Sequence, residues 1–308
     1  MAIDWAKIKS VEDLLRVDDN LYDESPEYGD DVYDFNLNPD LTDEEIEDAM
    51  FWSKYMRGIM LISGPAGSGK GLFAIMLAWK MRYYFGKTIM LDYKPRRIFG
   101  KYHPFNQQIL VNQISRMAQV ATGEVQQEIA KTRGGTEENP TLDGMTREWI
   151  ATSGKVFLQN SVLCLDEFKN YMYKRRPHNP MGITLGHIFD IWRHLDILIV
   201  GMTIDQSELD RYSCIPKLTT EVRTSWLTEH TIQKYGLAPY SCMATIYPLR
   251  YVGTAGEGVL EVSGKAQRVI VEGGKPREQL GGKRWVDLYN TKDPKVIQAP
   301  KSLTRRMQ

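Results

Sequence analysis

The chain has 308 residues, of which 42% are hydrophobic and 25% are charged, as in an ordinary soluble globular protein. No apolar run approaches the ~18 residues of a membrane-spanning helix and no signal peptide is visible, so an integral membrane or secreted protein is not expected. Three widely spaced cysteines, Cys164, Cys214 and Cys242, argue against a disulfide framework or zinc site and for a reducing, intracellular compartment.

The formal net charge of +0 hides an uneven distribution of charge along the chain. Residues 1–48 contain 17 acidic side chains and only three basic ones, so the basic excess lies in the remainder. A solvated, poorly ordered N-terminus fits this pattern, and so does an acidic arm that docks on a partner or on the basic part of the chain. We therefore divide the chain into an acidic arm at 1–48, a central domain at 49–234 and a C-terminal part at 235–308.

The first elements of the central domain surround a glycine-rich segment. Thr42 followed by Glu45 forms a capping box, which predicts a helix to about residue 55. The run GIMLIS at 58–63 predicts a short buried strand, and the apolar pattern at 72–85 predicts a helix. A second strand is expected at 88–93. Strand, glycine loop, helix and strand in this order form the context that a phosphate-binding loop requires.

The rest of the central domain alternates between helical and strand patterns. Residues 106–132 and 185–195 are expected to be helices, with a loop at 134–144, and strands are predicted at 161–168, 196–203 and 221–227. Such alternation predicts an α/β fold with a central, mostly parallel sheet flanked by helices on both faces.

Beyond Tyr235 the pattern changes to short β-type runs separated by glycine-rich turns, with no helical pattern between them. The runs lie at 242–249, 258–262, 267–271 and 283–289. They predict a small antiparallel β appendage, which ends in a basic tail.

The stretch GPAGSGKG at 64–71 matches the signature G-x-x-x-x-G-K-[ST] of a phosphate-binding loop except in its last position. In such a loop, glycines let backbone N–H groups point at phosphates, and the lysine reaches the β and γ oxygens. We expect a nucleotide to contact Gly64, Pro65, Ala66, Gly67, Ser68, Gly69, Lys70, Gly71 and Leu72.

Gly71 stands where the signature has a Ser or Thr whose hydroxyl reaches magnesium. Adenylate kinases also read GSGKG, but they continue with a Thr, whereas Leu72 follows here. Magnesium keeps several waters, so a shell of phosphate oxygens, water and Asp166 is compatible with its chemistry. We interpret the segment as a working site for ATP and Mg²⁺ with a modified metal shell; a loop that has lost its chemistry is the alternative.

Two carboxylates follow the buried run VLCL at the end of the strand predicted at 161–168. Asp166 would hold magnesium through water, and Glu167 would polarise the attacking water. Thr203, at the end of the next predicted strand, is the candidate that senses the γ-phosphate. A carboxylate pair that merely caps a helix is the alternative, but its position about a hundred residues after the glycine loop favours catalysis.

These residues resemble the P-loop ATPases that have a catalytic Glu and an extra strand between the P-loop strand and the Asp-Glu strand. From LDEF at 165–168 to IWRHLDILIVGMTIDQSELDR at 191–211, the chain resembles viral genome-packaging ATPases. It is also similar to their relatives among FtsK/HerA-type DNA translocases and filamentous-phage assembly ATPases. The resemblance covers roughly residues 58–230 and implies a homo-oligomeric ring, in which an arginine completes the neighbouring subunit's site. The candidates for that role are Arg175, Arg176, Arg193 and Arg211.

The resulting hypothesis is an ATPase that translocates double-stranded DNA and packages a viral genome, with a capsid or portal as a further partner. Such a protein would act in the cytoplasm of the host cell or with the virion. Basic stretches that could contact phosphates lie at 93–103, 174–176 and 272–284. A nucleotide or small-molecule kinase and a non-catalytic, nucleotide-gated assembly factor are the alternatives.

Overall fold

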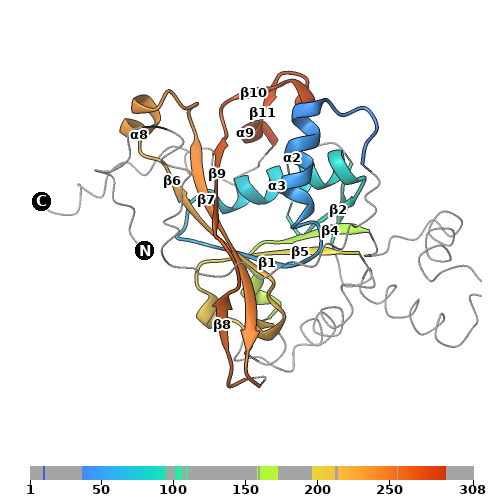
Figure 1. The fold of residues 1–308 in the computed structure, drawn as a ribbon, viewed down its shortest axis with the longest axis vertical. Helices are drawn as coiled ribbons and strands as arrows, with labels where there is room; N and C mark the ends of the chain where they lie inside the picture. The colour runs from blue at the N-terminus through green and yellow to red at the C-terminus, as the bar shows by residue number, and fades with distance from the viewer. Residues whose placement is uncertain are drawn as a thin grey trace, which may run out of the picture.

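The fold was analysed in a computed structural model, which describes Ser10, 37–93, Pro95, 101–105, Ile109, Leu158, 160–172, 196–211, 214–254 and 256–288. A nine-stranded mixed sheet forms the centre of these residues (Figure 1). Its strands are β1 (Gly58–Ser63), β2 (Thr88–Leu91), β3 (His103–Pro104), β4 (Ser161–Leu165), β5 (Leu198–Thr203), β6 (Thr220–Trp226), β7 (Ser241–Val252), β8 (Val259–Val262) and β9 (Gln267–Glu272). They lie in the order β3-β2-β4-β5-β1-β6-β7-β8, with β9 also paired to β7.

The six strands from β3 to β6 form the parallel part of the sheet. Every residue of β1, β4 and β5 is buried, because strands covered on both faces require continuous apolar runs. In the sheet order, β5 lies between β1 and β4. The extra strand between the glycine-loop strand and the Asp-Glu strand, which the sequence resemblance implied, is therefore present.

The described helices are α2 (Asp43–Ser53), α3 (Lys70–Phe85), α8 (Glu229–Lys234) and α9 (Trp285–Leu288). The capping box predicted at Thr42 and Glu45 starts α2. Side chains of α2, α3 and α9 share one hydrophobic core with one face of the sheet. Because α3 lies between the sheet and these neighbours, twelve of its sixteen residues are buried, as its apolar sequence requires.

The antiparallel strands continue the central sheet. The first part of β7 pairs with both β6 and β9, and its last four residues pair with β8. The predicted fold class, a mostly parallel α/β sheet with a small antiparallel C-terminal part, is confirmed. The division of the chain into an arm, an ATPase domain and an appendage stays a prediction.

Several predicted boundaries differ from the structure. The helix predicted from residue 72 begins at Lys70, and the strands predicted to end at 93 and 168 end at Leu91 and Leu165. The strand predicted at 283–289 is wrong: only Lys283–Arg284 is extended, as β11, and α9 follows. Trp285, Val286 and Leu288 are all buried, and Trp285 packs against Trp79 of α3, so tertiary packing overrides the local β propensity here.

The helices predicted at 106–132 and 185–195 and the loop at 134–144 lie outside the described residues. Within the described ranges, no helix is long and apolar enough to cross a membrane.

A buried lysine connects the loop after α3 to the loop before β5. The Lys87 side chain is 0% exposed; its Nζ lies 3.1 Å from Asp196 Oδ1 and donates a hydrogen bond of 2.8 Å to the Asp196 carbonyl. Arg57 donates to the same carboxylate. Burial lowers the pKa of Lys87 from 10.5 to about 8, although Asp196 opposes this shift.

We expect this lysine to make stability depend on pH. Between pH 8 and 10.5 the unfolded chain binds more protons at Lys87 than the folded chain, so the free energy of unfolding rises with pH in that window. In Lys87→Met this contribution is absent. The free energy of unfolding of wild type should therefore rise by up to about 3 kcal/mol relative to that of the variant between pH 8 and 10.5. Urea denaturation at both ends of the window measures it. The exposed Lys54→Met is the control, and a constant difference between wild type and Lys87→Met would contradict the prediction.

Candidate active site

The glycine-rich loop between β1 and α3 has a backbone that only glycine adopts easily at three positions. Gly64, Gly67 and Gly69 have φ angles of 150°, 76° and 96°. A Cβ on Gly64 would lie 2.6 Å from Ser68 Oγ and 2.8 Å from the Thr224 carbonyl, and one on Gly69 would lie 2.8 Å from Cys242. Gly64 and Gly69 are therefore also required for steric reasons, because the loop lies directly against β6 and β7.

A buried hydrogen bond holds the same loop on β6. Ser68 Oγ and Thr224 Oγ1 lie 2.8 Å apart, and both side chains are buried. The loop ends where α3 begins, at Lys70, so its last N–H groups belong to the N-terminus of a sixteen-residue helix. A helix N-terminus with inward-facing N–H groups favours anions, and phosphate above all.

Lys70 lies inside the loop that it follows. Its Nζ donates hydrogen bonds of 2.7 Å to the Gly64 carbonyl and 2.9 Å to the Pro65 carbonyl. Burial lowers the pKa of Lys70, and the charges of Asp166 and Glu167 oppose this shift. The amine thus lies between the loop and the two carboxylates at the end of β4.

Those carboxylates lie in a tight turn after β4. Glu167 has a left-handed backbone, with φ 48° and ψ 51°, which is uncommon for a residue other than glycine and ends the strand at Leu165. The next residue, Phe168, is fully buried, and its ring occupies the space where a side chain on Gly201 of β5 would lie, 2.5 Å from an added Cβ. Because Gly201 has no side chain, the Phe168 ring can pack against β5 and hold the turn on that side.

Asp92 fixes the turn on the other side. Its carboxylate oxygens accept hydrogen bonds of 2.8 and 3.0 Å from the Asp166 N–H, and Tyr171 donates a third, of 2.9 Å, to the same carboxylate. Burial raises the pKa of Asp92 to about 6. Asp92 was not singled out from the sequence, because this residue was placed inside the strand predicted at 88–93. The strand in fact ends at Leu91, so Asp92 follows it directly. A carboxylate near the end of a predicted strand is the signal that could have found it.

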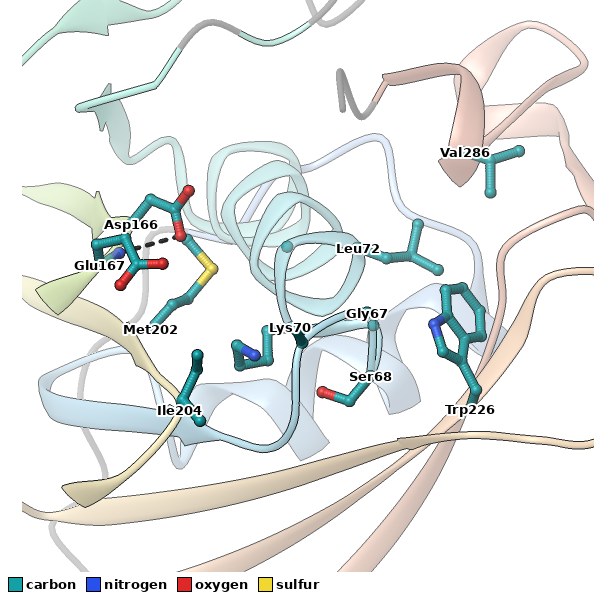
Figure 2. Close-up of a pocket in the computed structure, with 13 residues that line it drawn as sticks. Gly67, Ser68, Lys70, Leu72, Asp166, Glu167, Met202, Ile204, Trp226 and Val286 are labelled. Carbon is teal, nitrogen blue, oxygen red and sulfur yellow. Dashed lines mark hydrogen bonds between the residues drawn. The ribbon is translucent and has the colours of Figure 1, made fainter. Parts of the chain in front are cut away.

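One pocket brings the two halves of the site together (Figure 2). It is lined by Ala66, Gly67, Ser68, Gly69, Lys70, Gly71, Leu72, Asp166, Glu167, Met202, Ile204, Trp226 and Val286. Gly64 and Pro65 are not among the lining residues, but their carbonyls accept hydrogen bonds from Lys70, which is one of them. Most of the residues expected to bind nucleotide thus lie around one cavity with both predicted catalytic carboxylates, and their roles stay predictions.

Other predicted site residues lie elsewhere. Thr203 is buried and donates a 3.2 Å hydrogen bond to the Asp205 carbonyl, and its neighbours Met202 and Ile204 line the pocket instead. Arg175, Arg176 and Arg193 lie outside the described residues, and Arg211 is exposed.

The basic stretch at 272–284, which could contact phosphates, is not a loop throughout. Instead it holds the two-stranded hairpin of β10 (Pro276–Arg277) and β11 (Lys283–Arg284). Lys275 and Arg277 of this stretch both pair with Glu272, and Arg284 pairs with Asp287.

The pocket suits magnesium that arrives with a nucleotide. Among the described residues, no group of three or more His, Cys, Asp or Glu side chains could hold a metal ion without further ligands. Magnesium commonly takes one or two carboxylates, several waters and substrate phosphates, and Asp166 is placed to contribute the carboxylate. Gly71 lies in the first turn of α3, is buried and lines the same pocket, where it contributes no side-chain oxygen.

The similarity of the chain to the solved structures named below is low. No protein-family model and no curated protein matches the chain. Among solved structures, the N-terminal domain of zonular occludens toxin from Neisseria meningitidis has 15% sequence identity and a TM-score of 0.37, covering 76% of this chain and 100% of that one. The DNA-packaging ATPase from Sulfolobus Turreted Icosahedral Virus has 13% identity and a TM-score of 0.33, covering 68% and 96%. ATPases 2 and 3 of EssC from Geobacillus thermodenitrificans have 10% identity and a TM-score of 0.37, covering 79% and 42%.

The strand order of the described residues is that of a mostly parallel α/β sheet, with the glycine-rich loop between β1 and α3. A DNA-packaging ATPase of a virus is among these neighbours. Identities of this size concern fold alone, and function has to be argued from the site's own residues.

If Asp92 positions the Asp166–Glu167 turn, its removal should slow turnover more than it weakens nucleotide binding. In Asp92→Ala the Asp166 N–H loses its acceptor, and we expect kcat for ATP to fall about 10–100-fold because Glu167 is displaced. The dissociation constant of ATP should change less, since no residue of the P-loop takes part in the hydrogen bonds of Asp92 to Asp166 and Tyr171. Steady-state kinetics and equilibrium binding measure the two effects.

Two variants control for this result. Asp92→Asn keeps one acceptor oxygen and should recover part of the lost kcat, whereas Tyr171→Phe keeps the bond to Asp166 and should lose little. A kcat of wild-type size in Asp92→Ala would show that the turn does not depend on Asp92.

Proposed function

We propose that the chain binds and hydrolyses ATP together with Mg²⁺. The observation that supports this most is one pocket that contains the P-loop with Lys70 on one side and the carboxylates of Asp166 and Glu167 on the other. The loop N–H groups and the Lys70 amine would bind the phosphates and offset their charge. Magnesium, held by Asp166 through water, would supply further charge neutralisation at the phosphates.

Glu167 is our candidate for the general base. Its side chain is 51% exposed, and its carboxylate lies on the same side of the pocket as Asp166 (Figure 2). A carboxylate next to the γ-phosphate can orient a water and take its proton as the water attacks. A kinase of small molecules would instead need that position open for an acceptor, so the Asp-Glu pair favours hydrolysis.

We further propose that hydrolysis drives movement of double-stranded DNA, in a homo-oligomeric ring that packages a viral genome. The support for this finer proposal is the sequence resemblance over residues 58–230. A ring would allow Arg175, Arg176 or the exposed Arg211 to reach the γ-phosphate of a neighbouring subunit. A capsid or portal would be the partner at which the ring works.

Replacing the proposed base should separate binding from chemistry. Glu167→Gln keeps the shape of the side chain and removes its basicity, so ATP should bind as in wild type while turnover falls by ~10²-fold or more. Released phosphate and equilibrium ATP binding are measured on the same samples. The exposed Glu47→Gln on α2 is the control and should match wild type in both. Unchanged turnover in Glu167→Gln would remove Glu167 from the mechanism.

The DNA proposal is tested by turnover with and without double-stranded DNA, and by the mass of the particle in solution with ATP. A translocase should hydrolyse ATP faster on DNA and assemble into a ring, with Glu167→Gln assembling but not turning over. Phosphate transfer to a small acceptor in place of release would support a kinase. ATP binding without turnover in wild type would support a nucleotide-gated assembly factor.

A further inference from the structure

The pocket has a second end that the proposed chemistry does not use. Figure 2 shows Asp166, Glu167 and Met202 on one side of Lys70, and Leu72, Trp226 and Val286 on the other. All three side chains of this second group are apolar or aromatic. We infer that this end binds the base of the nucleotide, with the Trp226 ring as the surface on which the base stacks.

The position of the phosphate site determines where a base can lie. The γ-phosphate has to approach Glu167, and the loop and the first turn of α3 hold the phosphates between Lys70 and the helix N-terminus. The rest of the nucleotide therefore leaves the loop on the side away from Glu167. Leu72, the third residue of α3, borders that exit, and Trp226 and Val286 lie beyond it (Figure 2).

The side chains of Leu72 and Val286, which form the apolar wall of this end, are held in place by contacts within the protein. Val286 donates a 3.1 Å backbone hydrogen bond to the Gly273 carbonyl. An added Cβ on Gly273 would lie 2.9 Å from both Leu72 Cδ2 and Val286 Cγ1, so these side chains are packed around a glycine. Trp285, next to Val286, packs edge-on against Trp79 of α3 with the ring centres 5.3 Å apart.

Trp226 differs from these neighbours because it is only partly buried at the end of β6, which leaves aromatic surface open toward the pocket. A preformed apolar wall with one accessible aromatic ring suits a planar base. Stacking on an aromatic ring is tolerant of base identity, because every base presents a π-face.

The side chains of this end also indicate which nucleotides are accepted. Of the three, only the Trp226 indole carries a polar group, a single N–H donor. Discrimination between adenine and guanine needs donors and acceptors placed against the base edge, and none of the described lining side chains at this end supplies an acceptor. The site should therefore accept ATP and GTP with affinities within about fivefold of each other, through stacking in place of edge recognition.

This inference rests on the proposed binding of nucleoside triphosphates, and the probes are chosen to separate the two. Inorganic tripolyphosphate, ATP and GTP are titrated with Mg²⁺ into wild type, Trp226→Ala and Trp226→Phe, with the exposed Val259→Ala on β8 as a control. Tripolyphosphate reports on the P-loop alone, because it lacks ribose and base. Wild type that binds none of the three would overturn the proposed function itself, and this inference with it.

We expect Trp226→Ala to bind ATP and GTP about tenfold more weakly than wild type while its affinity for tripolyphosphate is unchanged. Trp226→Phe should bind both nucleotides nearly as wild type does, and Val259→Ala should match wild type throughout. Equal ATP affinity in wild type and Trp226→Ala would overturn the inference, as would a strong preference of wild type for one purine.

If Trp226→Ala also loses tripolyphosphate, the fold has been disturbed, and Trp226→Leu then replaces it. Leucine fills the space without a π-face, so weaker ATP binding by Trp226→Leu than by Trp226→Phe would support stacking, and equal binding would overturn it.

Discussion

The contact between the glycine loop and strands β6 and β7 is the constraint on which the rest of the site depends. Gly64 and Gly69 have no room for a side chain, because Thr224 and Cys242 lie close to where a Cβ would be. In addition, the hydroxyls of Ser68 and Thr224 share a hydrogen bond. The loop therefore takes its shape from two strands that come later in the chain; Ser68 and Thr224 are 156 positions apart. The antiparallel part of the sheet is a structural support of the glycine loop, and α9 adds Val286 to the same pocket.

The opposite side of the pocket depends on a different pair of supports. Asp92 binds the backbone of Asp166 from the end of β2, and Phe168 enters the space left by Gly201 on β5. Strands on both sides of β4 thus hold the turn that carries Glu167 in a left-handed conformation. Strain of this kind persists only where the surroundings over-determine it. The two halves of the site are fixed independently, which is why changes at Asp92 and Trp226 should have separable effects.

The sequence predicted those parts of the site that are contiguous in the chain. The P-loop, the buried strand before it, the helix after it and the Asp-Glu pair each have a short signature, and all were found. Asp92, Trp226 and Val286 were not predicted, because the fold and not a short motif brings them to the pocket or its supports; Asp92 and Asp166, for example, are 74 positions apart. Thr203 was chosen as the strand-end residue; its neighbours Met202 and Ile204 line the pocket, and the role of Thr203 stays a prediction. The strand predicted at 283–289 failed because packing against α3 overrides local β propensity at Trp285 and Val286.

The length of β7 has a mechanical consequence. The strand has twelve residues; Cys242 near one end contacts the P-loop, and Val252 at the other end pairs with Val259 of β8 in a hairpin that projects from the sheet (Figure 1). At about 3.3 Å per residue, the two ends lie roughly 33 Å apart. Over that length, a tilt of β7 by a few degrees at Cys242 would move the hairpin by about 2 Å. One strand thus joins the glycine loop to a hairpin far from the pocket.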